Sequence, residues 1–158
     1  MDLTVRQGTA ADAKVLTEVA RRAITITAAP FYDQLQIKQW ASHFTKPVLT
    51  QIIASRTVFV VWSGLSACGF ASLLSASAGQ EEVGELFVDP DFSGRGVARL
   101  ALEAVENEAK VRRIGRLRVD ASLLAAPVLE HLGYVVEERY DKDVASVVYR
   151  NTWLSKSL

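Results

Sequence analysis

Apolar residues recur along the chain at two spacings, one typical of helices and the other of strands. Between residues 97 and 113 they fall every three or four positions, which predicts a helix with one buried stripe and one solvated, charged face. On the charged face Glu106 precedes Lys110 by four residues, the order that favours an ion pair within a helix. The stripe comprises Val97, Leu100, Ala101, Ala104, Val105 and Ala109, and the charged face comprises Arg99, Glu103, Glu106, Lys110 and Arg113.

The rest of the pattern predicts a mixture of helices and strands. Thr9 followed by Asp12 is typical of a helix start, and apolar positions at helical spacing continue until Pro30. No repeat, low-complexity tract or linker interrupts the order, so we expect residues 1–158 to form a single domain. Further helices are expected at about 33–44 and 126–132, and another turn is expected to start at Pro47, before Ser55. Strands are expected at 3–7, 58–62, 67–75, 83–88, 116–120, 134–139 and 144–151.

One of these strands leads through a turn and a glycine loop into the helix described first. The strand ends at Val88, and Gly94 and Gly96 precede the first helical position at Val97. Main-chain N–H groups at a helix start have no partner within the helix and lie at the positive end of its dipole, which suits a phosphate group. Because the glycines have no Cβ atom to obstruct the approach, we interpret the loop as a pyrophosphate cradle.

Two other kinds of glycine loop fit this segment less well. A P-loop carries a lysine and a hydroxyl residue after its last glycine, whereas Val97 and Ala98 follow here. A dinucleotide-binding loop follows its strand directly and has a third glycine, but here the turn of residues 89–93 intervenes and Arg99 takes the third position. Asp120, near the place expected for a ribose-binding acid, is the feature that favours the dinucleotide alternative.

Composition and charge exclude several classes of protein. The chain has 158 residues, of which 49% are apolar and 23% charged, as is typical of one globular domain. Lys plus Arg equals Asp plus Glu at 18 each, so we expect neither nucleic acid nor membrane as a partner. A basic cluster stands where cations commonly offset a helix dipole and has no interleaved aromatic residues for base stacking; it comprises Lys110, Arg112, Arg113, Arg116 and Arg118.

The cellular compartment is also constrained by what the sequence lacks. No apolar run approaches the roughly 20 residues that cross a bilayer, and the N-terminus has no apolar core with a cleavage site. Cys68 is the single cysteine, and its strand-like surroundings indicate a packed thiol. His43 and His131 are too few and too far apart to suggest zinc. These features favour a cytoplasmic protein without a metal.

The order of elements and two motifs resemble the GCN5-related N-acetyltransferase (GNAT) family over nearly the whole chain. Leu86-Phe87-Val88-Asp89-Pro90 is similar to the family's fourth-strand signature, and Gly94-Arg95-Gly96-Val97-Ala98 to its acyl-CoA pyrophosphate loop. Residues 121–134 are similar to the segment that closes the family's fold. The resemblance implies an α/β fold with a central twisted, mostly antiparallel sheet, flanked by helices, in which the fourth and fifth strands splay apart.

The same resemblance implies acetyl-CoA as the co-substrate and no metal. The pantetheine arm of acetyl-CoA would enter between the splayed strands and pair with the main chain at Phe87 and Val88. Ser122 stands where relatives often carry a polar residue near the cofactor, and a turn-capping role for it is equally open. The amides expected to hold the pyrophosphate belong to Gly94, Arg95, Gly96, Val97, Ala98 and Arg99.

Two positions depart from the family pattern. Ser93 stands where the loop usually begins with Gln or Arg, which leaves the main-chain amides in place. Leu129 stands four residues before Gly133, where relatives often have the tyrosine that protonates the departing thiolate, so the usual general acid is missing. Tyr134 lacks that spacing and is expected to be a core or edge aromatic. A thiolate leaves readily near neutral pH, so the reaction does not strictly require a tyrosine.

A base is also needed, because an alkylamine is protonated at pH 7 and its lone pair is then unavailable. Glu85 begins the cofactor-binding strand, where similar enzymes often carry an acid that works through a water molecule, and we expect it to be this base. The neighbouring acids are expected to be solvated residues of the strand and turn; they are Glu81, Glu82, Asp89 and Asp91.

The acceptor of the acetyl group is less determined. In similar enzymes the segment between the first two strands shapes the acceptor pocket, so we expect Tyr32 and Trp40 to bind the substrate. Phe31, His43 and Phe44 complete an aromatic set that fits core packing equally well. A small-molecule amine and a peptide amine both remain open as acceptors.

Two functions from different classes therefore remain. The first is an N-acetyltransferase that moves the acetyl group of acetyl-CoA to a primary amine by direct attack. The second is a non-catalytic acyl-CoA-binding sensor or interaction module, which stays open because of Leu129. A homodimer through the strand pattern at 144–149 is a further open alternative, with Trp153 and Leu154 as another cover for that sheet edge.

Overall fold

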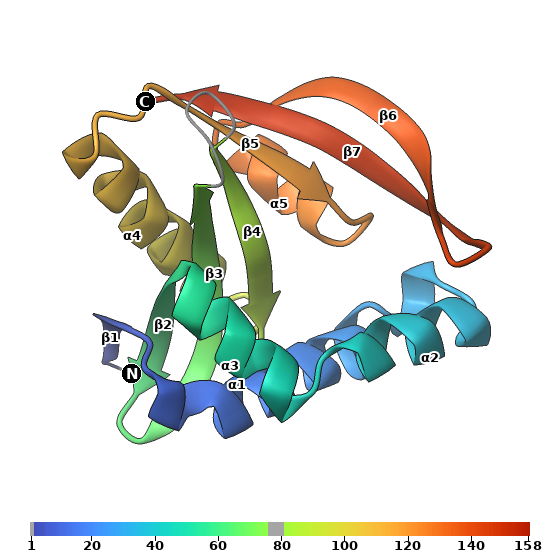
Figure 1. Ribbon diagram of the computed structural model, residues 1–158, viewed down its shortest axis with the longest axis horizontal. Coiled ribbons are helices and arrows are strands. Elements are labelled where there is room, and N and C mark those ends of the chain that lie inside the picture. The colour runs from blue at the N-terminus through green and yellow to red at the C-terminus, as the bar shows by residue number, and fades with distance from the viewer. Residues whose placement is uncertain (1, 76–80) are drawn as a thin grey trace.

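The protein, described here from a computed structural model over residues 2–75 and 81–158, forms one mixed sheet with helices on both faces (Figure 1). The described strands lie in the order β1-β2-β3-β4-β5-β7-β6, and β4 and β5 are the parallel pair, which confirms the expected fold. The strands are β1 (Leu3–Gln7), β2 (Thr57–Ser63), β3 (Ser66–Ser75), β4 (Glu81–Val88), β5 (Arg116–Ala121), β6 (Val135–Val144) and β7 (Val147–Ser157). The helices are α1 (Ala13–Arg22), α2 (Gln34–His43), α3 (Lys46–Ser55), α4 (Val97–Val111) and α5 (Ala125–His131).

The sheet separates two hydrophobic cores. Helix α4 packs against one face, and α1 and α3 pack against the other (Figure 1). Strand β2 contributes to both cores because its side chains alternate: Val61 lies in the α4 core, while Val58 and Val60 lie in the α1 and α3 core. Strand β3 is buried on both faces over residues 67–73. No helix of the described residues is long and apolar enough to cross a membrane.

The predicted start of the first helix is confirmed. The Thr9 N–H donates to Asp12 Oδ2 at 2.8 Å, and this carboxylate also pairs with Arg6 of β1 at 2.9 Å. After α1 the chain continues as a π-helical turn over Ala23–Thr27 and a 3-10 turn over Ala29–Phe31. The helical path therefore ends just beyond Pro30, close to the predicted end.

The expectation of a sheet edge at the last strand is wrong. Strand β7 is longer than predicted and lies inside the sheet, with β5 on one side and β6 on the other. Trp153 and Leu154 belong to β7 itself and are paired to both neighbours, so they cannot cover its edge. The sheet edges in the described residues are β1 and β6, so the homodimer left open for residues 144–149 could not form through β7, where residues 147–149 lie.

Glu106 is the exception to the predicted helix faces of α4. It was expected in the solvated row, but it is only 8% exposed and does not pair with Lys110. Its Oε1 accepts hydrogen bonds from Tyr134 Oη at 3.1 Å and from Lys156 Nζ at 2.9 Å. Residues from α4, the segment after α5 and β7 thus meet around one buried carboxylate, a partnership between distant segments that helical spacing cannot indicate.

Candidate active site

Strands β4 and β5 diverge soon after they begin to pair. Their parallel register covers two positions, Glu82 with Arg118 and Val83 with Val119. Beyond Val83 the side of β4 that faces β5 has no partner strand in the described residues, and Figure 1 shows the two strands separating. This geometry leaves main-chain N–H and C=O groups available along one side of β4, as at a sheet edge.

The register with β3 determines which β4 residues present these groups. The Asp89 N–H donates to Cys68 O at 2.8 Å, and Phe87 lies opposite Phe70 one hydrogen-bonded pair further along. Since bonded and non-bonded pairs alternate in an antiparallel ladder, the main chain of Phe87 faces β3, whereas the main chains of Leu86 and Val88 face the gap.

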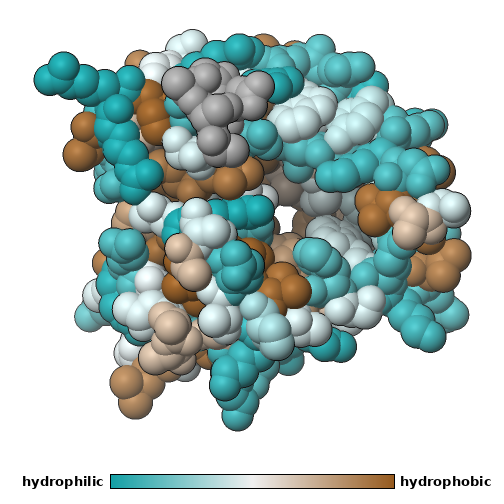
Figure 2. All heavy atoms as spheres, viewed as in Figure 1, coloured by the Kyte–Doolittle hydropathy of each residue, from teal (hydrophilic) through white to brown (hydrophobic). Residues whose placement is uncertain are grey.

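A large cavity occupies the space between the diverging strands. Its volume is about 1090 Å³, and it extends from the glycine loop before α4, along β4, to α2 and the start of β7. Figure 2 shows a hollow near the centre of the molecular face, where Figure 1 shows β4 and β5 apart. The cavity is large enough for an extended ligand together with a second, smaller one.

At one end of the cavity lies the predicted pyrophosphate cradle. Gly94 and Gly96 adopt φ values of 74° and 80°, and a Cβ atom at either position would meet nothing within 4 Å. The first intrahelical bond of α4 runs from the Leu100 N–H to Gly96 O at 3.1 Å. The N–H groups of Val97, Ala98 and Arg99 precede that bond, so they have no acceptor within the helix and are available to an anion.

The turn that leads into the cradle is held by an ion pair that the sequence did not reveal. Asp89 was expected to be solvated, but it is 8% exposed, and its Oδ2 lies 2.9 Å from Arg22 Nε at the end of α1. Asp89 Oδ1 also accepts a hydrogen bond from the Asp91 N–H at 3.0 Å. No local signal marks this pair, because 67 residues separate its members.

Glu85 stands at an irregularity in β4 and lines the cavity. The β3–β4 register shifts between Ala71 and Leu73, and the Ser72 hydroxyl fills the bulge: its Oγ accepts from the Glu85 N–H at 2.9 Å and donates to Glu85 Oε1 at 2.6 Å. Glu85 Oε2 pairs with Arg56, the residue that ends α3. The carboxylate is thus held in one orientation by two partners that sequence reasoning missed.

Aromatic side chains from four elements line the far end of the cavity. Tyr32 contacts Trp40 edge-on at 5.3 Å between ring centroids, and Trp40 lies 6.1 Å from Phe87. Tyr149 of β7 lies 6.1 Å from Tyr32. Of the predicted aromatic set, Phe31 does not line the cavity and is 53% exposed. Tyr32 and Trp40 therefore lie together on the cavity wall beside Phe87 and Tyr149, and their expected role in binding substrate stays a prediction.

The segment after β5 contains no replacement for the missing tyrosine. Leu129 is fully buried in the core beneath the cavity. Tyr134 is also buried, as expected, and burial together with Glu106 raises the pKa of its hydroxyl well above the usual range. Ser122 Oγ accepts from the Ala125 N–H at 3.2 Å, so the turn-capping interaction is present, and Ser122 lines the cavity as well.

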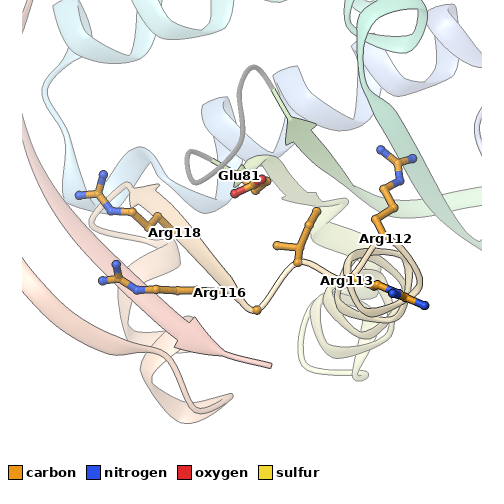
Figure 3. A pocket seen from close by; sticks show the side chains of 7 residues that line it. Glu81, Arg112, Arg113, Arg116 and Arg118 are labelled. Carbon is orange, nitrogen blue, oxygen red and sulfur yellow. The ribbon is translucent and has the colours of Figure 1, made fainter.

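The four arginines of the basic cluster line a separate hollow of about 560 Å³ at the end of α4, and Lys110 is not part of its lining. Figure 3 shows that Arg116 and Arg118 extend to one side and Arg112 and Arg113 to the other. Arg116 and Arg118 both pair with Glu137, and Arg112 pairs with Glu108. The cations do not converge on a common point. No group of three His, Cys, Asp or Glu residues in the described ranges could hold a metal ion.

Comparison with known proteins decides the family. The model of the acetyltransferase (GNAT) domain matches residues 27–148, which is most of the chain. The chain belongs to the GNAT acetyltransferase family. This match confirms the resemblance that the strand signature and the glycine loop indicated. The enzymes of this family transfer the acetyl group of acetyl-CoA. A curated relative, the uncharacterized N-acetyltransferase YafP of Escherichia coli (strain K12), is 29% identical over 84% of this chain and 81% of its own length.

Solved GNAT structures share the fold over the full chain. A GCN5-related N-acetyltransferase from Rhodopseudomonas palustris superposes with a TM-score of 0.90 and 27% identity, covering 100% of this chain and 97% of that one. The PaiA N-acetyltransferase from Thermoplasma acidophilum, solved in complex with coenzyme A, superposes with a TM-score of 0.81 and 21% identity, covering both chains completely. This GNAT protein therefore shares the fold of these solved acetyltransferases along its described length.

Proposed function

We propose that this GNAT acetyltransferase moves the acetyl group of acetyl-CoA to a primary amine by direct attack of the amine. One observation carries the proposal: a single cavity joins the free amides at the start of α4, the unpaired side of β4, Glu85 and an aromatic end wall. These are the parts that the pyrophosphate, the pantetheine arm, the base and the acceptor would need.

The cofactor side of the proposal uses main-chain groups. The pyrophosphate would lie on the amides of the loop and first helical turn, from Gly94 to Arg99, where the α4 dipole favours negative charge. The pantetheine amides would pair with β4 as an added strand. Because bonded and non-bonded pairs alternate, the main chains of Leu86 and Val88 are favoured for this pairing. The ring of Phe87 and the side chain of Ser122 would line the cavity around the cofactor.

Glu85 is the proposed base. The amine enters as an ammonium ion and must lose a proton before its lone pair can attack the thioester carbonyl. Glu85 would accept that proton through a water molecule, with its carboxylate held in place by Ser72 and Arg56. Attack gives a tetrahedral intermediate whose nitrogen carries one excess proton, and this proton passes to solvent. The carbon–sulfur bond then breaks, the thiolate leaves with the electron pair, and it takes up one proton.

The acceptor is proposed to be an amine with an apolar or aromatic body, either a small molecule or the amine of a peptide. Tyr32 and Trp40 form one wall of the cavity end, and Phe87 and Tyr149 form the neighbouring walls. Flat aromatic walls bury apolar surface at low entropic cost, and they also attract a cation before it is deprotonated.

The test measures CoA release from acetyl-CoA across a panel of amines that vary in charge and aromatic content. Wild type should turn over with at least one apolar amine, and Glu85→Gln should lower kcat/KM by about 100-fold or more with acetyl-CoA affinity unchanged. Glu103→Gln, an exposed change on α4, is the matched control and should behave as wild type. Binding of acetyl-CoA without transfer to any amine would instead favour the acyl-CoA-binding module, which the buried Leu129 still allows.

A further inference from the structure

The four tyrosines of the chain fall into two groups according to their hydroxyl hydrogen bonds. Tyr134 donates to Glu106, Tyr140 donates to Asp120 at 2.7 Å, and Tyr149 donates to Gln36 O at 3.1 Å. Tyr32 is different, because its Oη accepts a hydrogen bond from the Leu123 N–H at 2.9 Å. In residues 2–75 and 81–158 no carbonyl or carboxylate oxygen accepts its hydrogen, and the neighbouring Ser122 hydroxyl acts on it as a donor, so Tyr32 can give its proton to a ligand.

The hydroxyl of Tyr32 joins two segments of the chain that line the cavity. Tyr32 lies just before α2, yet its Oη reaches Leu123, directly beyond the end of β5. Its ring lines the cavity and is held between Trp40 and Tyr149. The hydroxyl is therefore fixed at the β5 side of the gap, on the same wall as α5 and Leu129, where the usual tyrosine of the family is missing.

We propose that Tyr32 is the general acid that protonates the departing CoA thiolate in place of the residue missing at Leu129. The inference rests on the proposed function. It accounts for the proton that the proposed mechanism returns to the thiolate: when the tetrahedral intermediate collapses, the carbon–sulfur bond breaks, sulfur takes the electron pair, and the Tyr32 O–H proton passes to sulfur. Tyr32 regains a proton from solvent before the next turnover.

The surroundings of Tyr32 suit both states of this acid. Burial raises the pKa of Tyr32 above its ordinary value, so the phenol is protonated at neutral pH. The Leu123 N–H and the Ser122 hydroxyl act in the opposite direction by favouring the phenolate, which stabilises the side chain after it has given its proton away. The remaining tyrosines lack this arrangement, because their hydroxyl hydrogens already bind protein oxygens.

The experiment compares wild type, Tyr32→Phe and Tyr140→Phe with the panel amine that wild type acetylates fastest. Tyr32→Phe should lower kcat by about 100-fold, while the affinity for acetyl-CoA, measured by calorimetry, stays within about twofold. The high-pH decline of kcat, which reports loss of the Tyr32 proton, should disappear in this variant. Tyr140→Phe, which removes a hydroxyl outside the cavity lining, should retain wild-type kcat.

A rescue variant separates acid catalysis from a structural role. Leu129→Tyr placed in the Tyr32→Phe background restores a hydroxyl at the family's usual position. The double variant should have a kcat at least tenfold higher than that of Tyr32→Phe, and the high-pH decline of kcat should return. A Tyr32→Phe enzyme with near-normal kcat, or one whose whole loss lies in acetyl-CoA affinity, would overturn the inference and leave the proposed function standing. Failure of wild type to acetylate any amine would overturn the proposed function and this inference together.

Discussion

Arg22 at the end of α1 holds Asp89 directly after β4, with Nε 2.9 Å from Oδ2. The same guanidinium reaches Asp91 at 3.3 Å. Because Asp89 also accepts a hydrogen bond from the Asp91 N–H, one arginine supports the whole turn that joins the cofactor-binding strand to the glycine loop. The cradle geometry therefore depends on a helix from the opposite face of the sheet.

Arg22→Met is expected to weaken acetyl-CoA binding. The variant leaves the Asp89 carboxylate buried without its cation, and the turn before the loop relaxes. We expect the Kd for acetyl-CoA, measured by calorimetry, to rise by about tenfold. Arg21→Met is the matched control, since Arg21 is its exposed neighbour on the same helix and forms no ion pair with Asp89. Equal affinities for the two variants would contradict this account.

Gly96→Ala should harm cofactor binding more than an equivalent glycine replacement elsewhere. Gly96 and Gly64 both have positive φ, 80° and 58°, with open space around the added Cβ, so each substitution costs about 1 kcal/mol of backbone strain. Gly64 lies in the turn between β2 and β3, away from the cavity. Both variants should lose a few degrees of Tm, but only Gly96→Ala should raise the Kd for acetyl-CoA, by about tenfold. An equal change in Kd for Gly96→Ala and Gly64→Ala would contradict the assignment of the glycine loop as the pyrophosphate cradle.

Lys156→Met should destabilise the fold by about 1–3 kcal/mol. The substitution leaves Glu106 with a single donor, Tyr134, for a carboxylate side chain that is 10% exposed, whereas Lys156 itself is partly solvated at 29%. Urea unfolding at pH 7 measures the loss. Lys156→Arg retains the positive charge and should recover most of the stability. A Lys156→Met protein with the unfolding free energy of wild type would contradict this prediction and show that Glu106 does not need Lys156.

Asp12→Asn should reveal a pH-dependent contribution to stability. The hydrogen bond from Arg6 lowers the pKa of Asp12 below its usual value near 3.8 in the folded protein. A depressed folded-state pKa stabilises the protein fully above the unfolded value and loses this contribution as pH falls through the folded value. The difference in unfolding free energy between wild type and Asp12→Asn, about 1 kcal/mol at pH 7, should therefore shrink below pH 4. A difference that is constant from pH 7 to 3 would assign the effect to packing alone.

Sequence patterns predicted most elements because local physics decides them. The apolar spacing of α4, the capping pair Thr9 and Asp12, and the glycines before Val97 each specify a conformation within one or two turns of chain. The main error in the elements is β7, which extends to Ser157 where the pattern predicted an end at Asn151. Residues 152–155 of β7 pair with both β5 and β6, and pairing with distant strands leaves no signal in nearby residues.

The residues of the candidate site also fall into two groups, those that sequence motifs indicated and those that only the structure revealed. Glu85 and the glycine loop were found from their positions in recognisable motifs, and the structure places both on one cavity. The partners Ser72 and Arg56 were missed because ordinary strand and loop residues give no sign of what they will contact. The hydrogen bond of the Tyr32 hydroxyl could not be predicted either, because its partner is the main-chain N–H of Leu123, 91 residues away.

By itself, the sequence determined the family, the alternation of helices and strands and the anion-binding start of α4, because these follow from residue type and short-range spacing. Only the tertiary structure decided that β4 and β5 part after two paired positions, that Arg22 reaches Asp89, and that the Tyr32 hydroxyl binds the Leu123 N–H. Those relationships depend on how distant segments pack. Packing energy is collective, so no single stretch of sequence contains it.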